Sequence, residues 1–248
     1  MFTMKSWILR TRGGTTVVAA LLAVMATQAL ALPPPPCIVP DNGLGTADLP
    51  PGGCGYTGLS PMMIINGLPP GTTIECTSYM DSFFDIFYLA GGMFGGEIQQ
   101  FHAQLAMELT GTGSMAGYFR PAFFDIFVEM DSGPRMPGSS LQDFPHELMS
   151  MQGQIMGDPD FDLLRITAGT NYGMPSPGHT TLTQVAGGDW SVDSFFDITY
   201  RIDFVGNPGG PLSGMSGSTT GTIRMQCGNS SAVPTEGTSW GDLKALYQ

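Results

Sequence analysis

The chain has 248 residues with 21 acidic and 9 basic side chains, which gives a formal net charge of −12. Nucleic acids and anionic membranes both require a basic patch on a protein partner, so this chain is a poor partner for either, and no nucleic acid is expected. The length suits one β domain or two small ones and is sufficient to bury a core.

Residues 1–31 have the three-part layout of a secretory signal peptide. A basic start is followed by the apolar run 17–26 and the small-x-small cleavage motif 29–31. The apolar run is about half as long as a membrane-crossing helix, which favours a cleaved signal over an uncleaved anchor. Cleavage removes three of the nine bases and no acid, so the mature chain has 21 acids, 6 bases and a charge of −15. We expect a secreted, periplasmic or cell-surface protein without a membrane span after signal removal.

Residues 32–61 form a Pro/Gly-rich N-terminal segment, which predicts coil. Two β-prone runs follow at 62–65 and 72–76, and the turn residues 66–71 lie between them. This arrangement predicts a β-hairpin at the start of the folded domain.

A short motif then recurs along the chain. Asp-Ser-Phe-Phe-Asp-Ile and its variants occur in four copies, at 81–86, 121–126, 160–163 and 193–198. The aspartates that the copies share are 40, 37 and 35 residues apart: Asp85, Asp125, Asp162 and Asp197. Each copy leads into a Gly/Pro turn and a second extended run. The spacing predicts about four strand-turn-strand repeats of 35–40 residues, which must pack on one another to bury their apolar faces.

Apolar and polar residues alternate cleanly in two of the extended runs, 101–109 and 196–204. One dry face and one wet face are typical of antiparallel strands. The fold class predicted for residues 62–227 is therefore all-β, an antiparallel β-sandwich, with a closed β-barrel as the alternative. The alternation also puts Asp125 and Asp197 on the solvent side, where an arginine on a neighbouring strand could pair with each.

Four cysteines in an exported chain predict two disulfides. Three pairings are possible, and Cys37–Cys54 with Cys76–Cys227 is the preferred one. Cys37–Cys54 would close the N-terminal loop, while alternation points Cys76 and Cys227 inward near the two ends of the β domain. Buried free thiols are the alternative.

One acidic cluster is a candidate metal site. Asp158, Asp160 and Asp162 occupy every second position at a turn that enters a strand, and carboxylate oxygens are preferred calcium ligands. The cluster lacks the glycine and the closing glutamate of an EF-hand loop. Calcium is thus the only cofactor that the sequence suggests.

The sequence contains no convincing catalytic constellation. Its one Gly-x-Ser-x-Gly match, at 237–241, has no preceding strand and leaves no room for a following acid and histidine. The histidines lack metal-ligand spacing. A carboxylate pair for glycoside cleavage remains an alternative, because the distance between two carboxylates is set by the tertiary structure and not by the sequence spacing. These observations make an enzyme less probable than a protein without catalytic activity.

Residues 228–248 form a polar linker and a short C-terminal tail. Four apolar residues of the tail share one helical face: Trp240, Leu243, Leu246 and Tyr247. The stripe indicates a docking or sorting tail, or a short helix that packs on its own domain.

Two stretches resemble other proteins. Residues 65–75 (INGLPPGTTIE), the DSFFDI copies and residues 177–181 resemble uncharacterised secreted proteins of environmental bacteria. Residues 235–247, with the pattern TSWGxLKALY, resemble a C-terminal segment found on otherwise different exported bacterial proteins, although Gln248 departs from the basic residue expected there. Neither resemblance implies a known activity. Both imply a bacterial origin and an envelope or extracellular location.

These features lead to three functional hypotheses. The first is a structural or interaction protein of the bacterial envelope or extracellular matrix, with a surface or matrix protein or a glycan as its partner. The second is a binding module for carbohydrate or another small ligand, which could depend on calcium. Candidate residues for a sugar-binding face are Tyr79, Tyr118, Tyr172, Trp190, Tyr200 and Trp240. The third is a secreted hydrolase that uses a carboxylate pair.

Overall fold

The computed structural model describes residues 36–228. The predicted signal peptide 1–31 and the tail residues Trp240, Leu243, Leu246 and Tyr247 lie outside this range. No helix within 36–228 is long and apolar enough to cross a membrane.

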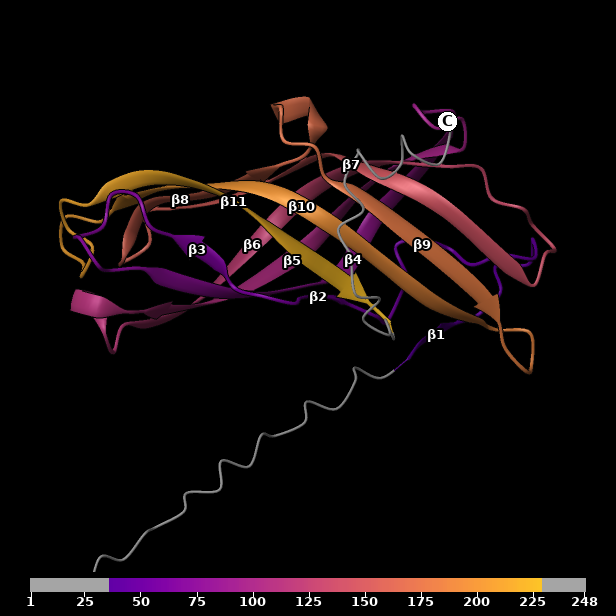
Figure 1. The fold of residues 1–248 in the computed structure, drawn as a ribbon, viewed down its shortest axis with the longest axis horizontal. Coiled ribbons are helices and arrows are strands. Elements are labelled where there is room, and N and C mark those ends of the chain that lie inside the picture. Colours follow the sequence, from indigo (N-terminus) through magenta and orange to yellow (C-terminus); the bar gives the residue numbers. More distant parts are fainter. Residues whose placement is uncertain (1–35, 229–248) are drawn as a thin grey trace, which may run out of the picture. The chain divides into compact units, whose positions relative to one another are not determined.

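The described chain is almost entirely antiparallel β-structure, which confirms the predicted fold class (Figure 1). The strands are β1 (Cys37–Val39), β2 (Tyr56–Gly58), β3 (Met62–Ile64), β4 (Ile74–Ala90), β5 (Glu97–Gly111), β6 (Phe119–Ser132), β7 (Leu141–Met156), β8 (Phe161–Ala168), β9 (Pro177–Gln184), β10 (Trp190–Gly206) and β11 (Ser216–Cys227). Two short 3-10 helices, η1 (Gly113–Met115) and η2 (Thr170–Tyr172), lie in connections.

The strands pair in the order β1-β10-β11-β2-β4-β5-β6-β7-β8, and β8 pairs back with β10. The sheet therefore folds over, so that β9, β10 and β11 form the nearer layer in Figure 1 and β5 and β6 the farther one. Strand β8 pairs with the C-terminal parts of β7 and β10, and strand β9 pairs with the N-terminal parts of the same two strands. The core fills the space between the two layers.

Alternation decides which side chains enter the core, as the sequence predicted. Every second residue of β10 is buried along nearly its whole length, and the same holds for β5 from Phe101 to Leu109. In the copies at 121–126 and 193–198, the second phenylalanine and the isoleucine are buried. The predicted hairpin is also present, since β3 pairs with the start of β4.

The N-terminal segment is more ordered than the predicted coil. It contains β1 and β2, each three residues long, which pair with β10 and with β11 and β4 respectively. Proline and glycine content indicates turns correctly here, but it carries no signal for strands whose partners lie far along the chain.

The repeat aspartate Asp197 forms the cross-strand pair that the alternation predicted. It lies opposite Arg224 and makes two hydrogen bonds of 2.7 Å with the guanidinium group, which also covers the ring of Phe195 at 4.0 Å. The second aspartate of this kind, Asp125, lies opposite Gln104 instead.

We expect the Asp197→Asn substitution to lower the free energy of unfolding by about 0.5–1 kcal/mol, because both partners are partly exposed and solvent screens the pair. The loss should shrink in molar salt, since exposed charges are screened there. Urea unfolding of the variant and the wild type at low and high salt checks both statements. A loss that does not depend on salt would show that the pair acts by shape rather than by charge.

Candidate functional site

The three aspartates of the predicted calcium site do not gather into one ligand set. Asp158 forms an ion pair with Arg120, whose Nε also lies 4.0 Å from a carboxylate oxygen of Asp160. Asp160 accepts a hydrogen bond from the hydroxyl of Tyr118 at 3.0 Å, while Asp162 is exposed on β8. One guanidinium group thus offsets part of the negative charge of this corner, and the three carboxylates do not converge on one point, so the geometry gives the calcium prediction no support.

The first predicted disulfide is present, and it closes the N-terminal loop. Cys37 and Cys54 are bonded, with their Cα atoms 5.8 Å apart. Their sulfur atoms and that of Cys227 all lie within 4.8 Å of one another. No other group of three potential metal ligands this close occurs in the described part of the chain.

The second predicted disulfide is wrong, because Cys76 and Cys227 are free buried thiols. Both point inward as expected, but they lie at different levels of the sheet. The register places Cys227 beside Tyr56, which pairs with Met80. Cys76 lies four residues from Met80 along β4, a distance of about 13 Å. No disulfide spans such a separation.

The candidate sugar-binding residues are dispersed rather than gathered. Trp190 and Tyr200 are buried in the core, and Tyr118 is partly buried beside Asp160. Only Tyr79 and Tyr172 are exposed among the candidates within 36–228. Trp240 lies outside the described residues.

An unpredicted set of exposed and partly exposed aromatic side chains covers the outer surface of β4, β5 and β6. We call it the aromatic face; its members are Tyr79, Phe84, Phe87, His102, Phe119, Phe123 and Phe127. Phe87, Phe119 and Phe123 each expose 60% or more of their surface. Aromatic side chains of this size together expose on the order of 500 Å² of apolar surface, as much as the largest patch on a typical soluble monomer, and such patches are often functional.

The centre of the aromatic face is a ladder of three rings. Phe84 lies opposite His102, and His102 lies opposite Phe127. Each pair of ring centroids is 5.4 Å apart, stacked in the first pair and edge-on in the second. The next level holds Tyr79 and Phe123 around Ala106, and between the two levels lie Asp81, Gln104 and Asp125. Aromatic and polar rows therefore alternate across the three strands.

Two β-bulges in β4 make this ladder possible. The register shifts by one residue between Asp81 and Phe84 and again between Phe84 and Phe87. A regular strand exposes every second residue on one face, so Phe84 and Phe87 would otherwise point to opposite sides. The extra residues, Ser82 and Asp85, have positive φ angles of 54° and 50°. This conformation costs about 1–3 kcal/mol at a residue other than glycine and is concentrated at functional sites.

A shallow groove of about 380 Å³ adjoins the ladder on the β7 side. Phe127 and Tyr172 are its aromatic walls, and its polar lining comes from His102, Asp125, Gln152 and Gln154. The Tyr172 hydroxyl donates a hydrogen bond to the Gln152 side chain at 3.2 Å, which holds η2 over β7. Rings and hydrogen-bonding groups thus occur together at one side of the aromatic face.

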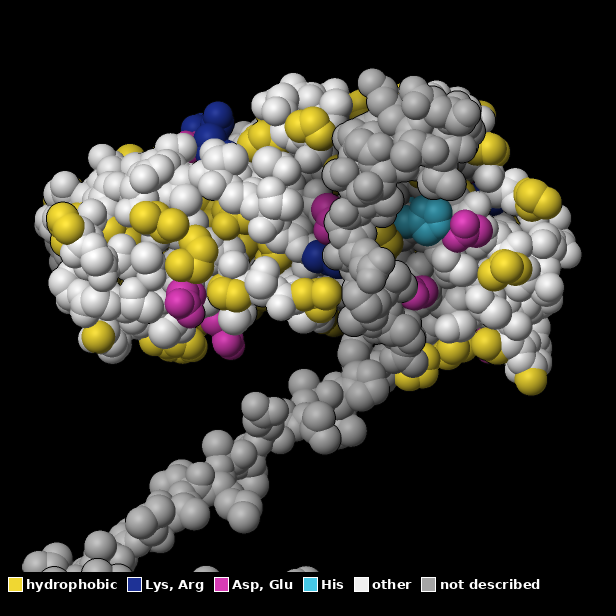
Figure 2. Space-filling view, in the orientation of Figure 1, with side chains coloured by type: hydrophobic (Ala, Val, Ile, Leu, Met, Phe, Trp, Pro, Cys, Tyr) yellow, Lys and Arg dark blue, Asp and Glu magenta, His cyan; other side chains and the backbone are white. Residues whose placement is uncertain are grey.

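The opposite side of the molecule has a different surface. Figure 2 shows the side formed by β9, β10 and β11, where the hydrophobic side chains that can be seen are scattered in small groups. Charged side chains also lie on this side, among them the ion pairs Asp197–Arg224 and Arg201–Asp203.

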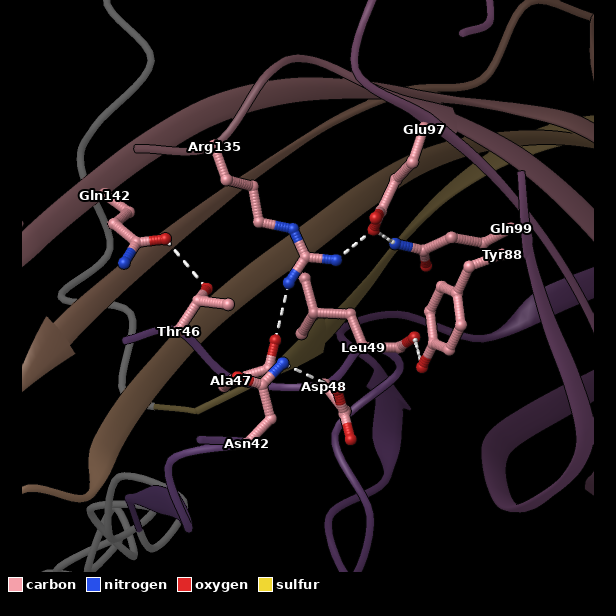
Figure 3. A network of polar contacts seen from close by, with 10 residues as sticks. All are labelled: Asn42, Thr46, Ala47, Asp48, Leu49, Tyr88, Glu97, Gln99, Arg135 and Gln142. Atoms are coloured by element: carbon pink, nitrogen blue, oxygen red, sulfur yellow. Dashed lines mark hydrogen bonds and ion pairs between the residues drawn. The ribbon is translucent and has the colours of Figure 1, made fainter. Parts of the chain in front are cut away.

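A larger pocket, of about 500 Å³, lies at one end of the sheet, where three connections meet. We call it the end pocket. Its walls are the N-terminal loop (42–48), the β4–β5 connection with Tyr88 of β4 beside it, and the β6–β7 connection with Arg135. Arg135 bonds to Glu97 and, at 2.5 Å, to the carbonyl oxygen of Ala47 (Figure 3). One side chain therefore ties all three walls together.

The other polar side chains of the end pocket are hydrogen-bonded as well. Gln99 donates to Glu97, and Asn42 donates to Asp48 at 2.9 Å. The Tyr88 hydroxyl donates to the carbonyl oxygen of Leu49 at 2.8 Å. Burial, with the charges of Asp48 and Glu97, raises the pKa of Tyr88 to about 12, so it stays a neutral donor.

The polar contacts of the end pocket hold its walls in place. The two carboxylates of the pocket, Asp48 and Glu97, are both held by neighbouring side chains. Neither serine nor histidine lines the pocket. The carboxylate-pair hydrolase therefore gains no argument from this geometry.

Comparison of the chain with protein-family models, with curated proteins and with solved structures finds no match.

Proposed function

We propose that this chain is an exported interaction protein of the bacterial envelope or extracellular matrix, and that its aromatic face holds a neutral glycan chain. The observation that carries the proposal is the ring ladder of Phe84, His102 and Phe127 beside a groove lined by the side chains of Asp125, Gln152 and Gln154. Export is supported by the signal-peptide pattern and by the oxidised Cys37–Cys54 pair, since disulfides persist in oxidising compartments.

The chemistry of the aromatic face favours a sugar polymer over other partners. The apolar faces of sugar rings can stack on aromatic rings, while sugar hydroxyls bond to amide and carboxylate oxygens, and binding sites combine these two kinds of group. Asp81 and Asp125 lie between the two ring levels, Glu129 lies in the next row beside the ladder, and the whole chain is acidic, so an anionic polymer would be repelled. A neutral polysaccharide meets both conditions.

The proposal predicts binding of the purified protein to at least one member of a panel of soluble neutral glucans and mannans, measured by affinity electrophoresis and calorimetry. The double substitution Phe84→Ala and Phe127→Ala should weaken that binding roughly 10- to 100-fold, because each stacked ring contributes about 1 kcal/mol or more. A sulfated polysaccharide of similar length should not bind, owing to repulsion.

The matched control is the double substitution Leu141→Ala and Val205→Ala, which removes exposed apolar side chains from other strands. It should bind like the wild type. Binding to none of the neutral polymers, or equal binding by the ladder variant, would overturn the proposal. Sedimentation analysis adds a second readout: reversible self-association that the ladder variant abolishes would assign the aromatic face to a second copy of the chain instead.

A further inference from the structure

Three cysteine sulfurs meet where β1, β10 and β11 come together. Cys37 begins β1 and lies opposite Val192 of β10, while Cys227 ends β11 and lies opposite Ser194 of the same strand. Cys54 is bonded to Cys37, and Cys227 is a free buried thiol with its sulfur within 4.8 Å of both bonded sulfurs.

The strand pairing explains this meeting. Strand β9 occupies one side of β10 along 190–193, so β1 must lie on the other side, in line with β11. Cys37 and Cys227 therefore follow one another along a single row, two residue positions or about 7 Å apart, and both point inward. Cα atoms joined by a disulfide are usually about 4.4–6.8 Å apart, so Cys227 lies just beyond bonding range. A small shift of the short segments around Cys37 or Cys54 would bring it within range.

We propose that Cys227 is the third member of a disulfide-exchange site with Cys37 and Cys54. Its thiolate attacks the sulfur of Cys54, the Cys54–Cys227 bond forms, and the Cys37–Cys54 bond breaks. The electron pair leaves on the sulfur of Cys37, which takes up the proton that Cys227 lost. Attack on Cys37 instead releases Cys54 in the same way. The number of disulfides is unchanged, so the exchange needs neither an oxidant nor a reductant.

The exchange would alter the attachment of the N-terminal loop. The Cys37–Cys54 bond closes the segment that includes the 42–48 wall of the end pocket. In the Cys54–Cys227 form, Cys37 is released and β1 is held by its three-residue pairing with β10 alone. The wall of the end pocket then loses its covalent anchor on the N-terminal side.

The surroundings of Cys227 keep this exchange slow at neutral pH. Burial, with the nearby charge of Asp193, raises the pKa of the Cys227 thiol to about 12. Only the thiolate attacks a disulfide. As long as the pH is below the pKa, the thiolate fraction grows about tenfold with each unit by which the pH rises. The exchange rate should therefore rise with pH between 7 and 10, provided that the fold persists.

The test uses the full chain with Cys37→Ser or Cys54→Ser, equilibrated in a mixture of reduced and oxidised glutathione and mapped by mass spectrometry. The first variant should contain a Cys54–Cys227 disulfide and the second a Cys37–Cys227 disulfide. Cys76 is the control within the same molecule, because it is also a buried free thiol, its pKa is likewise raised to about 12, and it belongs to no such sulfur group. It should stay reduced in both variants.

Cys227 that stays reduced in both variants, or that pairs as often with Cys76, would overturn the proposal. If the variants do not fold, the wild-type protein at pH 9 tests the same proposal. Mapping without reduction should then find a fraction of molecules in which Cys227 is bonded to Cys54 or Cys37, and the complete absence of that fraction would also overturn the proposal.

Discussion

Lowering the pH from 6.5 to about 3 should weaken the fold by about 1.4 kcal/mol for each pH unit through His146 alone. His146 is 1% exposed and packs on the ring of Phe196 with a centroid distance of 4.1 Å. Its Nε2 lies 3.0 Å from the hydroxyl of Thr180, which continues through Ser194 to Tyr56 as a buried polar chain.

The direction of the effect follows from the lowered pKa. Burial, with a smaller contribution from the charge of His179, lowers the pKa of His146 from 6.5 to about 3. Below pH 6.5 the unfolded chain binds a proton at this residue that the folded chain does not, so the unfolded state gains stability as the pH falls. The contribution is complete above pH 6.5 and is lost progressively down to about pH 3.

Urea unfolding at intervals between pH 7 and pH 4 measures this slope. The substitution His146→Gln keeps an acceptor for Thr180 but does not titrate, so its stability should fall much less steeply with pH. His179→Gln is the matched control: His179 is more exposed and hydrogen-bonds to Asp143 on the surface, and its loss should leave most of the slope in place. A wild-type slope equal to that of His146→Gln would contradict the prediction.

The parts of this fold that the sequence predicts best are those where one periodic signal is enough. In β10, seventeen residues alternate between core and surface, so the strand, its buried face and the outward position of Asp197 all follow from one pattern. The β3–β4 hairpin follows from turn residues between two β-prone runs. Both signals are local, and local signals survive folding when the core also favours them.

The misjudged features depend on partners far along the chain. Nothing near Cys76 or Cys227 indicates their levels in the sheet, which are set by the register of β2 against β4 and β11. Likewise, the spacing of Asp158 and Asp160 gives no sign of Arg120 on β6, which forms ion pairs with both. Periodicity gives the direction of a side chain and does not give its neighbours.

Part of the aromatic face could be predicted from the sequence. Once Phe124 and Ile126 are placed in the core, alternation leaves Phe123 and Phe127 on the surface, and Phe119 shares their side. The contribution of β4 was not readable, because the bulges at Ser82 and Asp85 break the alternation within a motif that stays regular in β10. Identical residues at 81–86 and 193–198 therefore have different structural roles.

Replacement of Arg135 by alanine should lower the free energy of unfolding by about 3 kcal/mol, because it leaves the partly buried Glu97 without its ion partner. The Arg135 side chain is only 10% exposed and also lies 5.6 Å from the centre of the Phe144 ring. It joins the N-terminal loop to the β4–β5 and β6–β7 connections, through the carbonyl oxygen of Ala47 and the carboxylate of Glu97.

The prediction specifies which segment loses structure as well as how much stability is lost. Hydrogen exchange of the Arg135→Ala variant should lose protection first in the N-terminal loop, where the side chain of Gln142 still bonds to Thr46 and Gly45. Arg201→Ala is the matched control: its side chain is 43% exposed, and its partner Asp203 keeps a second ion pair with Arg165, so the cost should stay below about 1 kcal/mol. Equal losses in the two variants would mean that the end pocket keeps its shape without Arg135, and that the three walls are held by backbone pairing and the Cys37–Cys54 bond instead.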